Sequence, residues 1–67
     1  MMTNAEFIAE LKKTHTEEQN DAQHYMDMAR SAPTQPVRDM LYEITRDEIM
    51  HKAKIECMLM TLEGSLS

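Results

Sequence analysis

The chain has 67 residues, 42% of them hydrophobic, and a net charge of −5, with one glycine, two prolines and one cysteine. This length allows one small domain, residues 1–67, and the composition indicates a globular helical chain. The negative charge argues against nucleic acid as a partner, and no apolar run approaches the roughly 20 residues that span a membrane. No secretory signal is visible and the lone Cys57 cannot form an intrachain disulfide, so we expect a cytoplasmic protein.

Local signals predict two helices joined by a short turn. Residues 3–6 read Thr-Asn-Ala-Glu, the form of a capping box, which predicts a helix over about residues 4–31. Two prolines define a turn at 32–35 and favour the start of a second helix, over about 36–63. Gly64 then supplies a helix stop. The expected fold is therefore an all-α, antiparallel two-helix hairpin.

One stretch of the first helix leaves an alternative open. Residues 14–21 contain no strongly apolar side chain, and Thr16 with Gln19 could form a second capping box that divides the helix. A helix that crosses a layer of metal ligands would also be polar there. The undivided helix is the favoured interpretation.

The second predicted helix carries a stripe with alternating spacings of four and three, the spacing of a face packed against another helix. Two adjacent members of the stripe, Glu48 and His51, are polar in an otherwise apolar row. A buried charge is strongly unfavourable unless it is paired or bound to a metal, so the stripe predicts a metal site. The stripe comprises Val37, Leu41, Ile44, Glu48, His51, Ile55, Met58 and Leu62.

The first helix has a matching stripe that also contains one glutamate. Folding the chain at Thr34 places Glu18 and Glu48 at about the same height, roughly 21–24 Å from the turn at about 1.5 Å per residue. Two carboxylates and the His51 imidazole suit Fe or Mn, and Zn is an alternative. Cys57 is expected to pack beside the second stripe. The first stripe comprises Phe7, Leu11, Glu18, Ala22, Tyr25 and Ala29.

These two segments resemble the ferritin-like di-iron carboxylate superfamily, of the rubrerythrin and encapsulated-ferritin type. Glu18-Gln-Asn-Asp-Ala-Gln-His-Tyr25 is similar to its E-x6-Y signature, and Arg46-Asp-Glu48-Ile-Met-His51 to its E-x-x-H helix. The resemblance covers most of the chain, but only as half of the four-helix fold. It implies that Glu18, Glu48 and His51 are metal ligands and that Tyr25 lies beside them. The lone Cys57 departs from rubrerythrins, which carry a further four-cysteine iron site.

The resemblance also implies an assembly and a chemistry. Two hairpins would form a homodimer, or a higher even oligomer, with a ferritin-like four-helix bundle and a di-iron site between two chains. Fe(II) would be oxidised by O2 or peroxide, a ferroxidase or peroxidase-like activity. The alternative is a non-catalytic module for helical oligomerisation or partner binding, with a structural metal or none.

Three further features of the sequence suggest additional roles: two polar residues near Glu18, Tyr25, and the C-terminal segment. His15 and Asp21 lie about 60° to either side of Glu18 on a helical wheel, so either could support the site or add a ligand, although solvated side chains are favoured. Tyr25 is expected to pack in the core and to hydrogen-bond a ligand carboxylate, with a redox role as an alternative. The segment 64–66 resembles the Gly-Ser-Leu tails that dock encapsulated ferritins in an encapsulin shell, but three residues give such a shell weak support.

Overall fold

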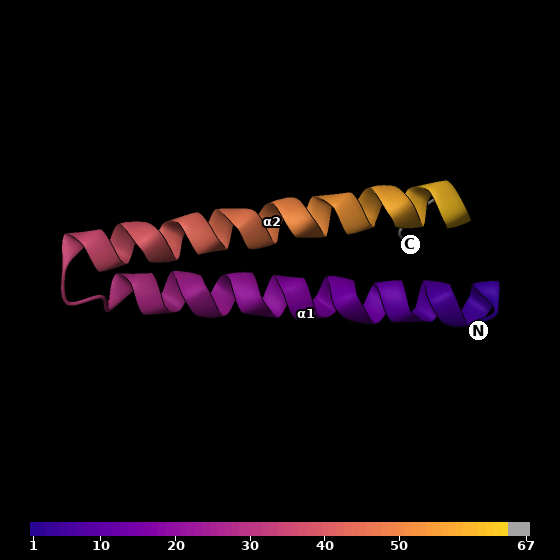
Figure 1. Ribbon diagram of the computed structural model, residues 1–67, viewed down its shortest axis with the longest axis horizontal. Coiled ribbons are helices and arrows are strands. Elements are labelled where there is room, and N and C mark those ends of the chain that lie inside the picture. Colours follow the sequence, from indigo (N-terminus) through magenta and orange to yellow (C-terminus); the bar gives the residue numbers. More distant parts are fainter. Residues whose placement is uncertain (65–67) are drawn as a thin grey trace.

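The computed structural model describes residues 1–64 and shows two long antiparallel helices (Figure 1). Helix α1 spans Asn4–Arg30 and helix α2 spans Gln35–Glu63. The predicted all-α hairpin is confirmed, with each helix end within one residue of its expected place. Helix α1 is continuous through residues 14–21, which excludes the divided helix. The tail that suggested a shell partner continues into residues 65–67, outside the described part of the chain.

The predicted signals at Thr3 and Gly64 form the outer helix ends, and Thr34, which was not predicted as a cap, begins α2. The Glu6 backbone N–H donates to Thr3 Oγ1 at 3.1 Å, and the Thr3 N–H donates to Glu6 Oε1 at 3.0 Å, which completes the capping box. Thr34 caps α2, with a proline in the first turn. Gly64 ends α2 with φ of 83°, a left-handed conformation that favours glycine, and its N–H donates to the Met60 carbonyl at 2.8 Å.

The seam between the helices changes in character along its length. Near the turn it is formed around Ala22 and the fully buried Ala29, whereas toward the termini it contains Ile55 and Leu59, the latter 1% exposed. The distance between packed helices depends on the side chains at the contact, so small residues allow a closer approach. Figure 1 accordingly shows α1 and α2 diverging from the turn toward the ends that carry the termini.

The seam uses only part of the stripe predicted for α2. Leu41, Glu48 and Ile55 lie at or near the contact with α1, where Thr45 and Leu59 are also buried. A single partner helix covers a narrow face, so the stripe members on the side away from this contact stay open to solvent. Contrary to the prediction that the whole stripe packs against a helix, the exposed members are Val37, Ile44, His51, Met58 and Leu62, and Phe7 of the α1 stripe is exposed as well.

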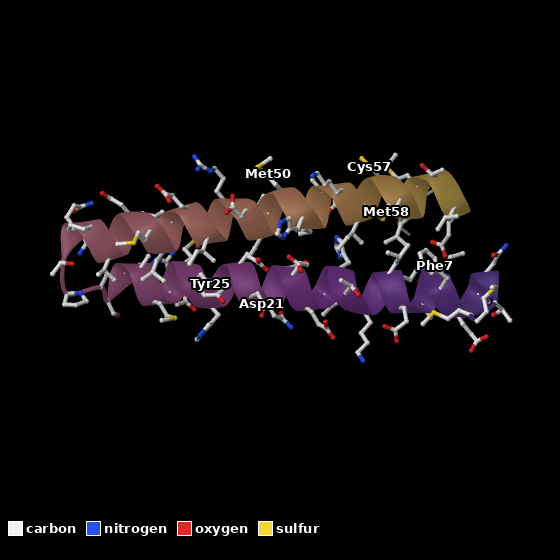
Figure 2. The ribbon with its side chains drawn as sticks, in the orientation of Figure 1. Phe7, Asp21, Tyr25, Met50, Cys57 and Met58 are labelled. Atoms are coloured by element: carbon white, nitrogen blue, oxygen red, sulfur yellow. The ribbon has the colours of Figure 1, made fainter. Side chains whose placement is uncertain are left out.

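The packing expected for Cys57 is also wrong, because its side chain is exposed. Figure 2 shows Cys57 and Met50 on the side of α2 that faces away from α1. Within the described residues, neither helix combines the length and the apolar character needed to cross a membrane.

Candidate metal centre

The three residues predicted as metal ligands come together at the middle of the hairpin. Glu18 extends from α1, and Glu48 and His51 lie one turn apart on α2, so they project from the same side of that helix. His51 Nδ1 lies 3.4 Å from Glu18 Oε2 and 3.7 Å from Glu48 Oε1. One potential ligand atom from each residue lies within 4.8 Å of the other two, a spacing that one cation could bridge after small side-chain movements.

Burial differs among the three side chains. Glu18 and Glu48 are 20% and 17% exposed, whereas the His51 side chain is 56% exposed. Glu18 Oε2 is inaccessible to solvent and accepts no hydrogen bond; its 3.4 Å contact with His51 Nδ1 is an ion pair without hydrogen-bond geometry. A buried carboxylate oxygen that accepts no hydrogen bond is costly, because its lost hydration is replaced only in part.

The pKa of Glu48 reflects an excess of negative charge at the cluster. A hydrogen bond to Glu18 raises the pKa of Glu48 above its ordinary value of 4.5, and burial and the negative charge of Glu18 raise it further. His51 lowers this pKa, and Asp21 adds a smaller rise. Two neighbouring carboxylates that are not balanced by one imidazole disfavour the doubly ionised form.

These observations fit a divalent cation. A cation would coordinate the Glu18 oxygen that accepts no hydrogen bond and would neutralise the charge that raises the pKa of Glu48. Carboxylate and imidazole donors together suit Fe, Mn or Zn. Three protein ligands leave coordination positions open, and the exposed side of the cluster is where further ligands would approach.

The other predicted site residues have different surroundings. His15 Nε2 lies 2.9 Å from Glu56 Oε1, on the opposite side of the seam from the cluster, so its partner is a carboxylate that the sequence analysis had not considered. Asp21 is exposed and influences the cluster through its charge. Tyr25 is half-buried two turns from Glu18, and its ring lies against the ring of His24, with centroids 5.8 Å apart. The role of Tyr25 beside a metal stays a prediction.

The seam therefore has two unlike sides. We call the side with the cluster the open flank. Most of its exposed residues lie seven or fourteen residues apart on each helix, in line with His51 on α2, and Leu62 follows Met58 by four. We call the other side the closed flank, where polar side chains pair across the helices. The open flank comprises Phe7, Asp21, Met28, Val37, Ile44, His51, Met58 and Leu62.

The closed flank holds the residues that sequence reasoning missed. Lys12 Nζ lies 2.9 Å from Glu63 Oε1, and Lys52 Nζ lies 4.0 Å from the same Glu56 oxygen that His15 contacts. The spacing of Lys52 and Glu56, four residues apart, was a visible signal for a pair on one helix. The contacts between α1 and α2 required knowledge of how the two helices are rotated.

Fold and cluster together define the chain as an α-helical hairpin with a carboxylate–histidine group across its seam. In comparisons with family models, with curated proteins and with solved structures, nothing matches this chain. The resemblance to ferritin-like proteins thus depends on the two short motifs and on the cluster that they form.

Proposed function

We propose that this protein binds iron at Glu18, Glu48 and His51 and that two chains together form a di-iron site that oxidises Fe(II). The observation that carries the proposal is the convergence of two carboxylates and an imidazole, in which one buried carboxylate oxygen accepts no hydrogen bond. A purely structural ion pair would balance these charges, as the pairs on the closed flank do. The cluster instead has an excess of negative charge, which is typical of a cation site.

The chain's own residues would have separable roles. Glu18 and Glu48 supply negative charge to hold Fe(II), the substrate, at the middle of the hairpin, and they would compensate the added charge of the ferric product. His51 adds a neutral nitrogen donor, and its exposed side keeps the cluster accessible to O2 or peroxide. Two Fe(II) ions held together would supply two electrons to the oxidant, so that with two protons from solvent O2 would be reduced to hydrogen peroxide, or peroxide to water, without a free-radical step.

The proposal requires a second copy of the chain. One chain offers three ligands, and two chains would offer six, enough for two ions with open positions for the oxidant. The apolar members of the open flank provide a surface for that association, because a row of exposed apolar side chains along a helix pair is typical of a protein interface. The expected assembly is a homodimer or a higher even oligomer.

The decisive experiment follows the oxidation of Fe(II) that has been added without oxygen. On exposure to O2 or peroxide, the ferric absorbance should rise faster than in a protein-free control. Zn(II) added first should slow the reaction, because it takes the same ligands and has no redox chemistry. The matched control is Glu56→Ala, which removes a glutamate from the closed flank and should leave the rate unchanged.

The same experiment distinguishes an iron-oxidising protein from the alternative, a non-catalytic helical module with a structural metal. If bound Fe(II) oxidises no faster than free Fe(II), while Glu48→Ala still abolishes binding, the metal is structural and the protein is a helical binding module. If Glu48→Ala leaves the iron stoichiometry unchanged, the metal site itself is wrong.

A further inference from the structure

The polar contacts between the two helices are confined to one part of the hairpin. We call residues 1–17 and 52–64, which lie on the side of the cluster that carries the termini, the terminal half, and residues 19–47 the turn half (Figure 1). On the turn side of the cluster the described helices meet through packed side chains such as Ala22 and Ala29. The described ion pairs that join the helices all lie at the cluster or in the terminal half: Lys12–Glu63, His15–Glu56, and the contact of His51 with Glu18.

The turn has the features of a hinge. The Ser31 and Ala32 N–H groups donate to carbonyls of α1 at 3.0 and 3.2 Å. The Arg38 N–H donates to the Thr34 carbonyl at 3.1 Å, within the first turn of α2. Among the residues described at the turn, each hydrogen bond therefore belongs to one helix and none joins the two. Because both helices are continuous, the soft backbone dihedral angles of the hairpin are concentrated in residues 31–34.

A hinge at the turn moves the two halves by different amounts. Two rigid helices that separate about residues 31–34 open most at the termini, and about half as much at the cluster, which lies near the middle of both helices. The packing around Ala29, close to the hinge, changes little. Opening therefore separates the terminal half and draws Glu18 away from Glu48.

The burial of Glu18 gives a reason for such an opening. Glu18 Oε2 is inaccessible to solvent, and Glu48, on the other helix, is 17% exposed. An ion that binds both carboxylates has to enter between the helices. In the metal-free protein the two carboxylates repel each other, which favours separation, whereas a bound cation attracts both. The presence and the absence of the ion thus act on the hinge in opposite directions.

We propose that the hairpin opens about a hinge at residues 31–34 to admit a divalent cation, and that the bound cation holds the terminal half closed. The Lys12–Glu63 and His15–Glu56 pairs limit the opening, because they join the helices on the far side of the cluster from the hinge. The inference rests on the proposed metal site and not on iron oxidation. It concerns how an ion reaches Glu18, so an ion without redox chemistry tests it.

A cross-link over the terminal half tests whether the cation enters by this opening. In a Cys57→Ala background, Lys12→Cys and Glu63→Cys replace two side chains that meet at 2.9 Å, and a reducible bis-maleimide joins them. Stopped-flow mixing with a zinc-sensitive dye follows the binding of Zn(II). The cross-link should slow association roughly tenfold or more, without changing the zinc stoichiometry, and reduction of the linker should restore the rate.

The matched control carries the same linker on a single helix. Met50→Cys with the native Cys57 places both thiols on the side of α2 that faces away from α1 (Figure 2), where a linker does not restrain the hinge, so the association rate should stay unchanged. Equal rates in the cross-linked and reduced proteins overturn the proposal, because side-chain rotation then suffices to admit the ion. If no variant binds zinc, the metal site itself is wrong and the hinge proposal falls with it.

Distances between the helices test the motion itself. In the Cys57→Ala background, spin labels at Glu10→Cys and Met60→Cys report on the terminal half, and labels at His24→Cys and Tyr42→Cys on the turn half; all four positions are exposed. In samples diluted with unlabelled chain, the metal-free terminal pair should show a broad distance distribution that Zn(II) narrows and shortens, while the turn pair changes little. A terminal distribution that is already narrow without Zn(II), or a turn pair that changes as much, overturns the proposal.

Discussion

The open and closed flanks of the seam both contain glutamate and histidine side chains, but they differ in how the carboxylates are paired. On the closed flank each carboxylate has a cationic or imidazole partner from the other helix, as in the pairs Lys12–Glu63 and His15–Glu56, both at 2.9 Å. On the open flank Glu18 and Glu48 share a single imidazole, and one buried Glu18 oxygen accepts no hydrogen bond. The charges of the closed flank are balanced across the two helices, whereas the cluster on the open flank keeps an excess of negative charge that a cation would neutralise.

The first prediction compares one glutamate from each flank. Glu48→Ala, like His51→Ala, should abolish the binding of about one iron per chain, and Glu18→Ala should do nearly as much, because each removes a ligand from a set of three. Glu56→Ala should retain full stoichiometry. Iron analysis after gel filtration measures the difference, and equal loss in Glu48→Ala and Glu56→Ala would remove the distinction between the flanks.

The second prediction separates the buried seam from the open flank. Leu59→Ala leaves a cavity between the helices and should cost about 2–5 kcal/mol, enough to unfold much of a domain this small. Leu62→Ala, at a side chain that is 49% exposed, should change the stability of the hairpin little and weaken its dimerisation. Urea denaturation and sedimentation at several concentrations distinguish the two effects. An equal loss of stability at all concentrations in Leu62→Ala would show that this residue belongs to the hairpin core.

The third prediction concerns the pH dependence of the metal-free protein. The raised pKa of Glu48 means that the folded state binds this proton more tightly than the unfolded state does. The resulting stabilisation is fully present below the ordinary pKa of 4.5 and is lost as the pH rises through the higher folded-state pKa. Relative to wild type, Glu48→Gln should therefore become more stable as the pH rises from 4.5 toward 7.

Thermal unfolding of both proteins across this range provides the measurement. Glu6, whose pKa is lowered by its hydrogen bonds to Thr3, has the opposite pH dependence, but it is present in both proteins and cancels in the difference. A difference that does not vary with pH would contradict the unbalanced cluster.

The smallest expected effect belongs to the closed flank. His15→Ala should lower the stability of the hairpin by about 0.2–1 kcal/mol, because partly exposed ion pairs contribute little. The loss should be equal with and without iron, since His15 contacts Glu56 and not the cluster. Chemical denaturation in both conditions provides the check. A loss confined to the iron-loaded protein would place His15 in the metal site.

Local signals were sufficient to predict the helices and their ends. The capping box at Thr3 and the glycine stop at Gly64 act within a few residues, so the sequence contains the whole interaction. The common height of Glu18 and Glu48 followed from counting residues on either side of the turn. These predictions needed no knowledge of how the helices pack.

The rotation of the helices could not be predicted in the same way. The stripe from Val37 to Leu62 marks an apolar face of α2, whether α1 or a second chain covers it, and it omits Leu59, which is buried in the seam. The structure divides that surface, giving Leu41 and Ile55 to the seam and leaving Ile44 and Met58 on the open flank. Sequence periodicity gives the width of an apolar face, and only the position of the partner helix tells which part of it is buried.

The placement of Glu18 and Glu48 on different helices has a thermodynamic consequence. Glu48 follows Glu18 by thirty positions, so any ion that bridges the two carboxylates closes the intervening chain into a loop. Such an ion binds the folded chain and not the extended one, and at a hundredfold excess over its dissociation constant it adds about 2.7 kcal/mol to folding stability. For a chain this short, that is a large share of the total. The supply of metal in the surroundings would then set how much of the protein exists as a hairpin at all.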